Sequence, residues 1–133
     1  MSEGQVSEGI YHPVAHCGGT DNPQAADYDR RWLLVHSGGQ WLTRGICPRL
    51  GEITVELRFG YLVLRAPGML RIDIPLDVIE DDDSVREAIL VGTQAVDVVD
   101  EGELAAAWVS NFAGIPCRLM KVHPEMGPFD WPE

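Results

Sequence analysis

Short segments in which apolar and polar residues alternate are the feature that most constrains how this chain folds. Residues 52–57 read Glu-Ile-Thr-Val-Glu-Leu, and residues 70–76 repeat the alternation. Successive side chains of a β-strand point to opposite faces, so this pattern indicates strands with one buried and one solvated face. Glycine-containing turns at 59–60 and 66–68 separate these segments. The sequence therefore predicts antiparallel β-structure joined by tight turns.

Further apolar segments extend this pattern along the chain, and one helix interrupts it. Leu104, Trp108 and Phe112 recur at the spacing of a helix face, with Asp100 as the expected N-cap and Gly114 as the expected end. We predict a mainly β fold, a β-barrel of about seven or eight short strands with one α-helix in the C-terminal half. The expected strands are residues 32–36, 40–43, 52–57, 61–65, 70–76, 85–91, 95–99 and 117–122.

A chain of 133 residues is expected to form one domain. We assign residues 10–122 to it and expect residues 1–9 to be a flexible N-terminus. Residues 123–133 contain three prolines and no periodicity, so we expect a disordered tail. The acidic run at 80–83 is expected to be a solvated loop, because a calcium loop places its oxygen ligands at alternating positions.

The charge balance bears on partners and location. Asp and Glu number 21 against 10 Lys and Arg, which gives a net charge of -11. Such a chain repels phosphates, so nucleic acid and anionic membranes are not expected partners. Its three cysteines, which are Cys17, Cys47 and Cys117, lie at least thirty residues apart and form no disulfide framework. With no signal-like N-terminus and no apolar run long enough to span a bilayer, a cytoplasmic protein is expected.

An arginine-rich segment stands out in this acidic chain. Residues 27–50 contain four arginines, which are Arg30, Arg31, Arg44 and Arg49. The guanidinium group matches carboxylate or phosphate with a planar fork of donors. Arg30 and Arg31 precede a predicted strand, so their side chains should point to opposite faces and one of them should face a groove. The alternative is that Asp27 and Asp29 form local ion pairs that brace the loop.

The segment HPVAHC, residues 12–17, is a second candidate constellation. Imidazole and thiolate groups suit zinc, copper or iron, and Cys17 with His16 and Asp29 could form a nucleophilic site. Gly18 and Gly19 could also present backbone N–H groups to an anion. The alternative is a loop with exposed histidines and a half-buried thiol. No glycine loop typical of nucleotide binding is present in the sequence.

Four motifs in order resemble a known family. They are IYHPVAHCGG (10–19), DRRWLLVHSGGQWLTRGICPRLGEI (29–53), LVLRAPGMLRIDIPL (62–76) and GELAAAWVSNFAGIPCRLMKV (102–122). Together they are similar to the MOSC N-terminal β-barrel domain. The resemblance implies a domain that normally precedes a MOSC domain, the module carrying the molybdenum cofactor. It also implies that the pterin phosphate is contacted by a Lys-Ser pair of the first motif and by an arginine, which corresponds to Arg30.

The sequence departs from the family pattern at two places. The Lys-Ser pair is Ala15-His16 here, and a second family arginine corresponds to Gly45, with Arg44 displaced by one position. Because the sequence ends at residue 133, we expect a stand-alone, non-catalytic module. It would bind a small anionic ligand of pterin or phosphate type, or a MOSC-type or other partner protein. The candidate ligand-binding residues are His16, Gly18, Gly19, Arg30, Arg31 and Arg44.

Two other classes of function stay open at this point. The first is a protein–protein interaction or structural domain with no small-molecule ligand, in which the arginines only brace loops. The second is a small thiol or metal enzyme that uses His12, His16 and Cys17. The molybdopterin-type cofactor is suggested by the family resemblance alone.

Overall fold

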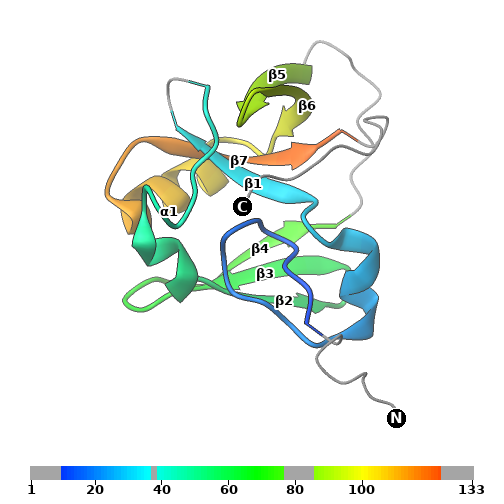
Figure 1. The fold of residues 1–133 in the computed structure, drawn as a ribbon. Coiled ribbons are helices and arrows are strands. Elements are labelled where there is room, and N and C mark those ends of the chain that lie inside the picture. The colour runs from blue at the N-terminus through cyan, green and yellow to red at the C-terminus, as the bar shows by residue number, and fades with distance from the viewer. Residues whose placement is uncertain (1–9, 37–38, 77–85, 124–133) are drawn as a thin grey trace.

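The computed structural model describes residues 10–36, 39–76 and 86–123, which form two antiparallel sheets (Figure 1). The four-stranded sheet has the order β1 (Trp32–His36), β7 (Cys117–Val122), β6 (Gln94–Asp100), β5 (Arg86–Val91), and the three-stranded sheet the order β2 (Thr54–Arg58), β3 (Tyr61–Arg65), β4 (Ile72–Pro75). The other elements are the helix α1 (Glu103–Ala113) and the 3-10 helices η2 (Pro23–Tyr28) and η3 (Pro48–Glu52). The predicted mainly β fold with one late helix is confirmed.

The three-stranded sheet follows directly from the alternating pattern. β2 and β3 pair antiparallel, and their apolar residues Val55 and Leu64 are partners on the buried face. The turn between them places Phe59 at φ 51° and Gly60 at φ 82°. Positive φ at both central residues is the hairpin geometry that matches the twist of the strands. In β4, Ile72 is buried beside exposed neighbours, as the alternation predicts.

The four-stranded sheet curls back on itself, and one predicted strand is replaced there. Instead of a regular strand at 40–43, Gln40 forms a parallel bridge with Leu90 of β5, and Trp41 forms an antiparallel bridge with Val35 of β1. The segment is thus divided between two strands, which is why it makes no regular hairpin. These bridges bring the β5 edge back toward β1 and give the sheet its partial barrel form.

Two apolar cores occupy the two faces of the four-stranded sheet. The larger core lies between the sheets and α1, and Trp32, Leu34 and Phe112 are buried in it. The smaller core lies on the opposite face, where Leu33 and Val35 are buried. This division follows from the alternation of side chains along β1. Further members of the smaller core are Trp41, Ile89, Val91, Val96, Val98, Met120 and Val122.

The helix begins later than the sequence indicates. Its N-cap is Gly102, and Asp100 is the last residue of β6, so the predicted Asp100 cap is wrong. The Asp100 carboxylate instead accepts the Gly102 N–H at 2.8 Å and a hydrogen bond from Arg118. The C-terminal prediction is confirmed, because Gly114 ends the helix in the left-handed conformation at φ 79°.

Several sequence predictions lie outside the described residues. These are the flexible segment 1–9, the acidic run 80–83 and the tail from residue 124 onward. The described chain continues as far as His123, whose side chain is buried and whose N–H donates to the Asp97 carbonyl at 2.9 Å. Within 10–36, 39–76 and 86–123, no helix is long and apolar enough to cross a membrane.

Candidate functional site

The site is built around residues 10–20, which we call the first loop. It is held beside β1 by two backbone hydrogen bonds, from the Ala15 N–H to the Trp32 carbonyl at 2.8 Å and from the Trp32 N–H to the Pro13 carbonyl at 2.9 Å. A bridge between Tyr11 and Thr20 closes its base. The buried side chains of residues 13–15 anchor this stretch in the protein. The ends of the loop therefore have fixed positions relative to the sheet.

Arg44 is docked on one end of the first loop. Its Nε donates to the His16 carbonyl at 2.8 Å, and its Nη2 donates to the Cys17 carbonyl at 3.0 Å. These contacts use two of the five N–H donors of a guanidinium group. Both acceptors are neutral, so they hold the exposed side chain in place without compensating its charge. The result is an oriented cation with donors left for a ligand.

His16 is held in an unusual conformation at the same place. Its φ is 67°, in the left-handed region that non-glycine residues seldom adopt. The Nδ1 atom accepts the Arg44 backbone N–H at 3.2 Å, which places the proton of the neutral ring on Nε2. The ring also packs edge-on against Trp41, with 4.9 Å between the ring centroids. His16 therefore belongs to one unit with Arg44.

The two glycines of the first loop allow close backbone contacts. The Gly18 N–H donates to the Ile53 carbonyl at 2.8 Å, and a Cβ at this position would lie 2.7 Å from the same oxygen. A Cβ at Gly19 would lie 2.8 Å from the Ile10 side chain. Glycine is thus required where the loop passes the end of η3. Because the Gly18 N–H already donates to the Ile53 carbonyl, it cannot bind an anion.

Arg30 and Arg31 lie near the other end of the first loop. The Arg30 N–H donates to the His12 carbonyl at 2.7 Å, and the His12 N–H donates to Asp29 Oδ1 at 2.8 Å. Arg31 Nη2 donates to the Asp27 carbonyl at 3.4 Å. The expectation that the two arginines alternate on a strand is wrong, because Arg30 sits in a turn at φ 53° and β1 begins at Trp32.

The six predicted residues thus lie on or beside the first loop, but they do not converge on a single binding site. His16, Gly18 and Gly19 lie on the first loop beside Arg44, whereas Arg30 is hydrogen-bonded to the loop through His12. The fourth arginine of the segment has a packing role. The Arg49 guanidinium carbon lies 4.3 Å from the centroid of the Phe112 ring, a cation–π distance.

The thiol chemistry considered from the sequence does not fit the position of Cys17. The side chain is fully buried, and burial raises the pKa of its thiol to about 12, although Arg44 acts in the opposite direction. The nucleophile of thiol chemistry is the thiolate, which such a group does not supply near neutral pH. Among the residues that the structure describes, no group of three or more His, Cys, Asp or Glu side chains could hold a metal ion.

Sequence reasoning missed a buried lysine, Lys121, and the ion pair between Arg118 and Glu103. Lys121 is 4% exposed, and its Nζ donates to the Leu76 carbonyl at 2.7 Å beneath the Trp32 ring. On β7, Arg118 donates to Glu103 of α1 at 2.8 Å. The signal available was the presence of two basic residues, Arg118 and Lys121, in an otherwise apolar strand, residues 117–122.

The two sheets and the helix α1 form a small, partly closed β-barrel domain. The chain matches the family described as the MOSC N-terminal beta barrel domain over residues 3–116 and belongs to that family. The resemblance seen in the four motifs is therefore confirmed.

The related proteins are much longer than the matched segment. Human molybdenum cofactor sulfurase is 35% identical over 96 residues, which cover 71% of this chain and 11% of that protein. The zebrafish (Danio rerio) protein of the same name is 38% identical over 106 residues, 77% of this chain and 13% of its own. Mitochondrial amidoxime reducing component 2 of Rattus norvegicus is 28% identical over 119 residues, 82% of this chain and 35% of its own. The chain thus spans between about a tenth and about a third of these relatives.

A solved structure shares the whole fold. The solution structure of a protein encoded by a gene of Bordetella bronchiseptica superposes with a TM-score of 0.81 and is 65% identical in sequence. The match covers 96% of this chain and 98% of that one.

Proposed function

We propose that the protein is a non-catalytic module that binds a small anionic ligand of pterin or phosphate type at the first loop. The observation that carries the proposal is the docking of Arg44 on the carbonyls of His16 and Cys17. An arginine held by neutral acceptors keeps its full charge and is already oriented. Little conformational entropy is then lost when an anion binds, which favours binding.

The residues around Arg44 fit the phosphate end of such a ligand. The first-motif lysine of the family is replaced by Ala15, which is 4% exposed and offers no charge. Arg44 takes over the cationic role in this proposal, with the Nε2–H of His16 as a neutral neighbour. Arg30, which is hydrogen-bonded to His12 of the first loop, is a second contact by family resemblance. The names of the relatives, molybdenum cofactor sulfurase among them, support a pterin ligand.

A second candidate function is an interaction module that packs against a MOSC-type partner. It is favoured by two exposed leucines, since Leu70 is 88% and Leu104 is 79% exposed. The segments that carry them are joined through Trp108, which lies one helical turn after Leu104 and whose Nε1 donates to the Leu70 carbonyl at 2.6 Å. A Leu70→Ser/Leu104→Ser variant that still co-purifies with a co-expressed MOSC domain as the wild type does would exclude this surface. Phe59→Ser, at an exposed hairpin tip, is the matched control.

The anion proposal is tested by calorimetric titration with inorganic pyrophosphate and with a synthetic pterin phosphate. Arg44→Gln removes the charge but keeps a hydrogen-bonding side chain, and should weaken binding about tenfold, as expected for a charge-assisted contact. Arg58→Gln is the matched control, because Arg58 is an exposed arginine whose contacts, with Glu56 at 3.9 Å and the Phe59 ring at 5.5 Å, lie within its own hairpin.

The two variants separate the proposed site from general electrostatics. Equal weakening in Arg44→Gln and Arg58→Gln would mean that only the net charge matters and would exclude the site. Wild-type binding that does not fall with added salt would also count against it, since attraction between exposed charges is screened.

A further inference from the structure

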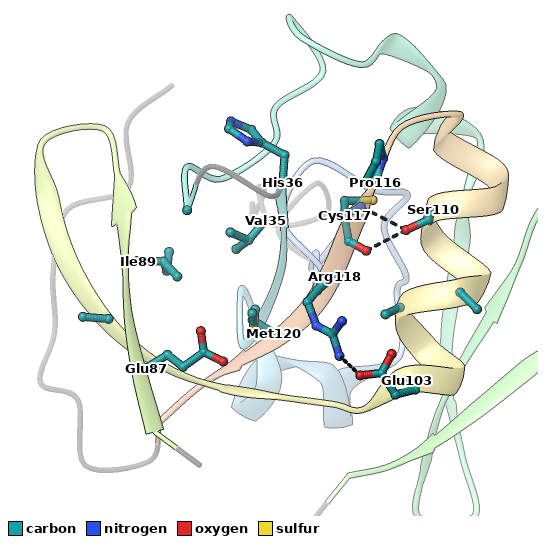
Figure 2. A pocket seen from close by; sticks show the side chains of 14 residues that line it. Val35, His36, Glu87, Ile89, Glu103, Ser110, Pro116, Cys117, Arg118 and Met120 are labelled. Atoms are coloured by element: carbon teal, nitrogen blue, oxygen red, sulfur yellow. Dashed lines mark hydrogen bonds and ion pairs between the residues drawn. The ribbon is translucent and has the colours of Figure 1, made fainter. Parts of the chain in front are cut away.

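A concave site lies between α1 and the β5–β6 hairpin, and neither Arg44 nor its partners His16 and Cys17 line it. It has a volume of about 450 Å³, within the range of small-molecule sites. Figure 2 shows α1 on one side of it, the β5–β6 hairpin on the other, and Arg118 between them. Its polar lining residues are His36, Glu87, Glu103, Ser110 and Arg118.

The positive charge in this cavity is already compensated. Arg118 donates to Asp100 and, at 2.8 Å, to Glu103. The hydrogen bond that Arg118 donates to Asp100, followed by the one it donates to Glu103, raises the pKa of Arg118 above its usual range, so the guanidinium is always charged. One cation between two carboxylates leaves this triad with a net negative charge. An anion therefore gains little by approaching Arg118.

Glu87 adds a second negative charge. Its carboxylate extends from β5 into the space between the hairpin and β7 (Figure 2). Within the described residues, no hydrogen bond or ion pair occupies this carboxylate. Because it faces the triad of Arg118, Asp100 and Glu103 across the cavity, the site has a negative potential with one carboxylate available to a ligand.

The rest of the cavity is apolar and held in shape. Val35, Ile89 and Met120 form its floor, and Ala107 and Pro116 stand at its exposed side. α1 is fixed to β7 by a reciprocal pair of bonds: the Ser110 hydroxyl donates to the Cys117 carbonyl at 2.7 Å and accepts the Cys117 N–H at 2.9 Å (Figure 2). A ligand would therefore meet a site that is largely preformed.

We propose that this cavity binds a small organic cation, a primary amine attached to a single ring or short alkyl body, with the ammonium group at Glu87 and the body against the apolar floor. The net negative lining selects the charge, and the enclosed volume selects a small molecule. The inference goes beyond the anion-binding function and does not depend on it, because the two sites share no residue.

The proposal is tested by amide chemical-shift mapping with three probes of nearly equal shape: benzylamine, benzyl alcohol and benzoate. Benzylamine is expected to shift the amides of Glu87, Ala88 and Ala107, with a dissociation constant of about 1 mM for so small a ligand. Benzyl alcohol should bind about fivefold more weakly, and benzoate more weakly still, as expected for loss of a partly exposed ion pair.

Three variants complete the test. Glu87→Gln should weaken benzylamine binding about fivefold and leave benzyl alcohol unchanged. Glu52→Gln, which neutralises an exposed carboxylate in η3, should change neither. Ala107→Leu keeps a good helix former but obstructs the cavity, and should weaken both probes. Equal affinity for amine and alcohol, preference for benzoate, shifts that fall elsewhere, or no binding at all would overturn the proposal.

Discussion

Arg44 and Arg118 are both arginines that join two segments distant in sequence, yet their surroundings give them opposite roles. Arg44 binds the carbonyl oxygens of His16 and Cys17, which are neutral. Arg118 binds the carboxylates of Asp100 and Glu103. The charge of the Arg44 guanidinium is left uncompensated and can attract a ligand, whereas the charge of Arg118 is compensated within the protein. The comparison teaches that the charge of the acceptor decides whether an arginine is a site for anions or a structural link.

The backbone also differs between the first loop and the cavity beside α1, which we call the α1 cavity. The first loop places His16 at positive φ and passes close to η3 through Gly18, and Arg30 beside the loop is also at positive φ. The α1 cavity is formed by a regular helix and regular strands, joined by hydrogen bonds between Ser110 and Cys117. Strained conformations in non-glycine residues persist only where the surrounding structure holds them. The first loop should therefore be the more sensitive of the two to small changes.

The largest effect is expected at Gly18. In Gly18→Ala, the new Cβ would approach the Ile53 carbonyl oxygen to 2.7 Å, and the loop would have to move. We expect a loss of about 3 kcal/mol in the free energy of unfolding, near the upper end for overpacking. Gly45→Ala is the control, because its Cβ would meet only Thr43 Oγ1 at 3.5 Å. Denaturant melts showing the two variants equally stable would refute the close contact.

The buried thiol of Cys17, in the first loop, should make the stability of the protein fall at alkaline pH. Its thiol has a pKa of about 12 in the folded protein against 9.0 for the unperturbed group, chiefly because of burial. The unfolded chain therefore releases this proton at a lower pH than the folded protein does. The contribution of the thiol to the free energy of unfolding is fully present below pH 9 and is lost as the pH rises toward 12. The loss is about 2 kcal/mol at pH 10.5. Cys17→Ala should lack this part of the decline in denaturant melts; parallel curves for variant and wild type would contradict it.

The removal of Arg118 should have a smaller effect on stability. Arg118→Met leaves the carboxylates of Asp100 and Glu103 without their cation, and should cost about 1.5 kcal/mol, moderated by partial exposure. In an Arg118→Met/Glu103→Gln variant, part of the lost stability should be recovered, because one uncompensated negative charge has been removed. Thermal melts of the single and double variants measure the recovery. An unchanged melting temperature in the single variant would mean that the ion pairs contribute nothing.

The strands and the end of the helix could be predicted from the sequence because their signals are local. Alternation predicted β2 and β4, the turn at 59–60 predicted the returning strand β3, and Gly114 predicted the end of α1. The start of α1 was mistaken because Asp100 has a competing partner in Arg118, eighteen residues away. The segment after β1 failed as a strand because Gln40 pairs with Leu90, a contact that no local pattern encodes.

The candidate site was predictable by residue type but not by geometry. The sequence indicated which arginines to consider, yet contained no sign that Arg44 reaches the carbonyls of His16 and Cys17, 28 and 27 residues earlier. It also led us to place Arg30 on a strand, where the structure has a turn. The α1 cavity was missed altogether, because Glu87 and Arg118 become neighbours only when β5 and β7 join one curled sheet.

The most direct test of this account is a single chemical-shift experiment on one wild-type sample, titrated first with inorganic pyrophosphate and then with benzylamine. The account predicts two separate sets of shifted amides, pyrophosphate acting around His16 and Arg44 and benzylamine around Glu87 and Ala107. Pyrophosphate shifts centred on Arg118, or one common set of shifts for both probes, would contradict the claim that the acceptors of an arginine decide which ligand its site takes.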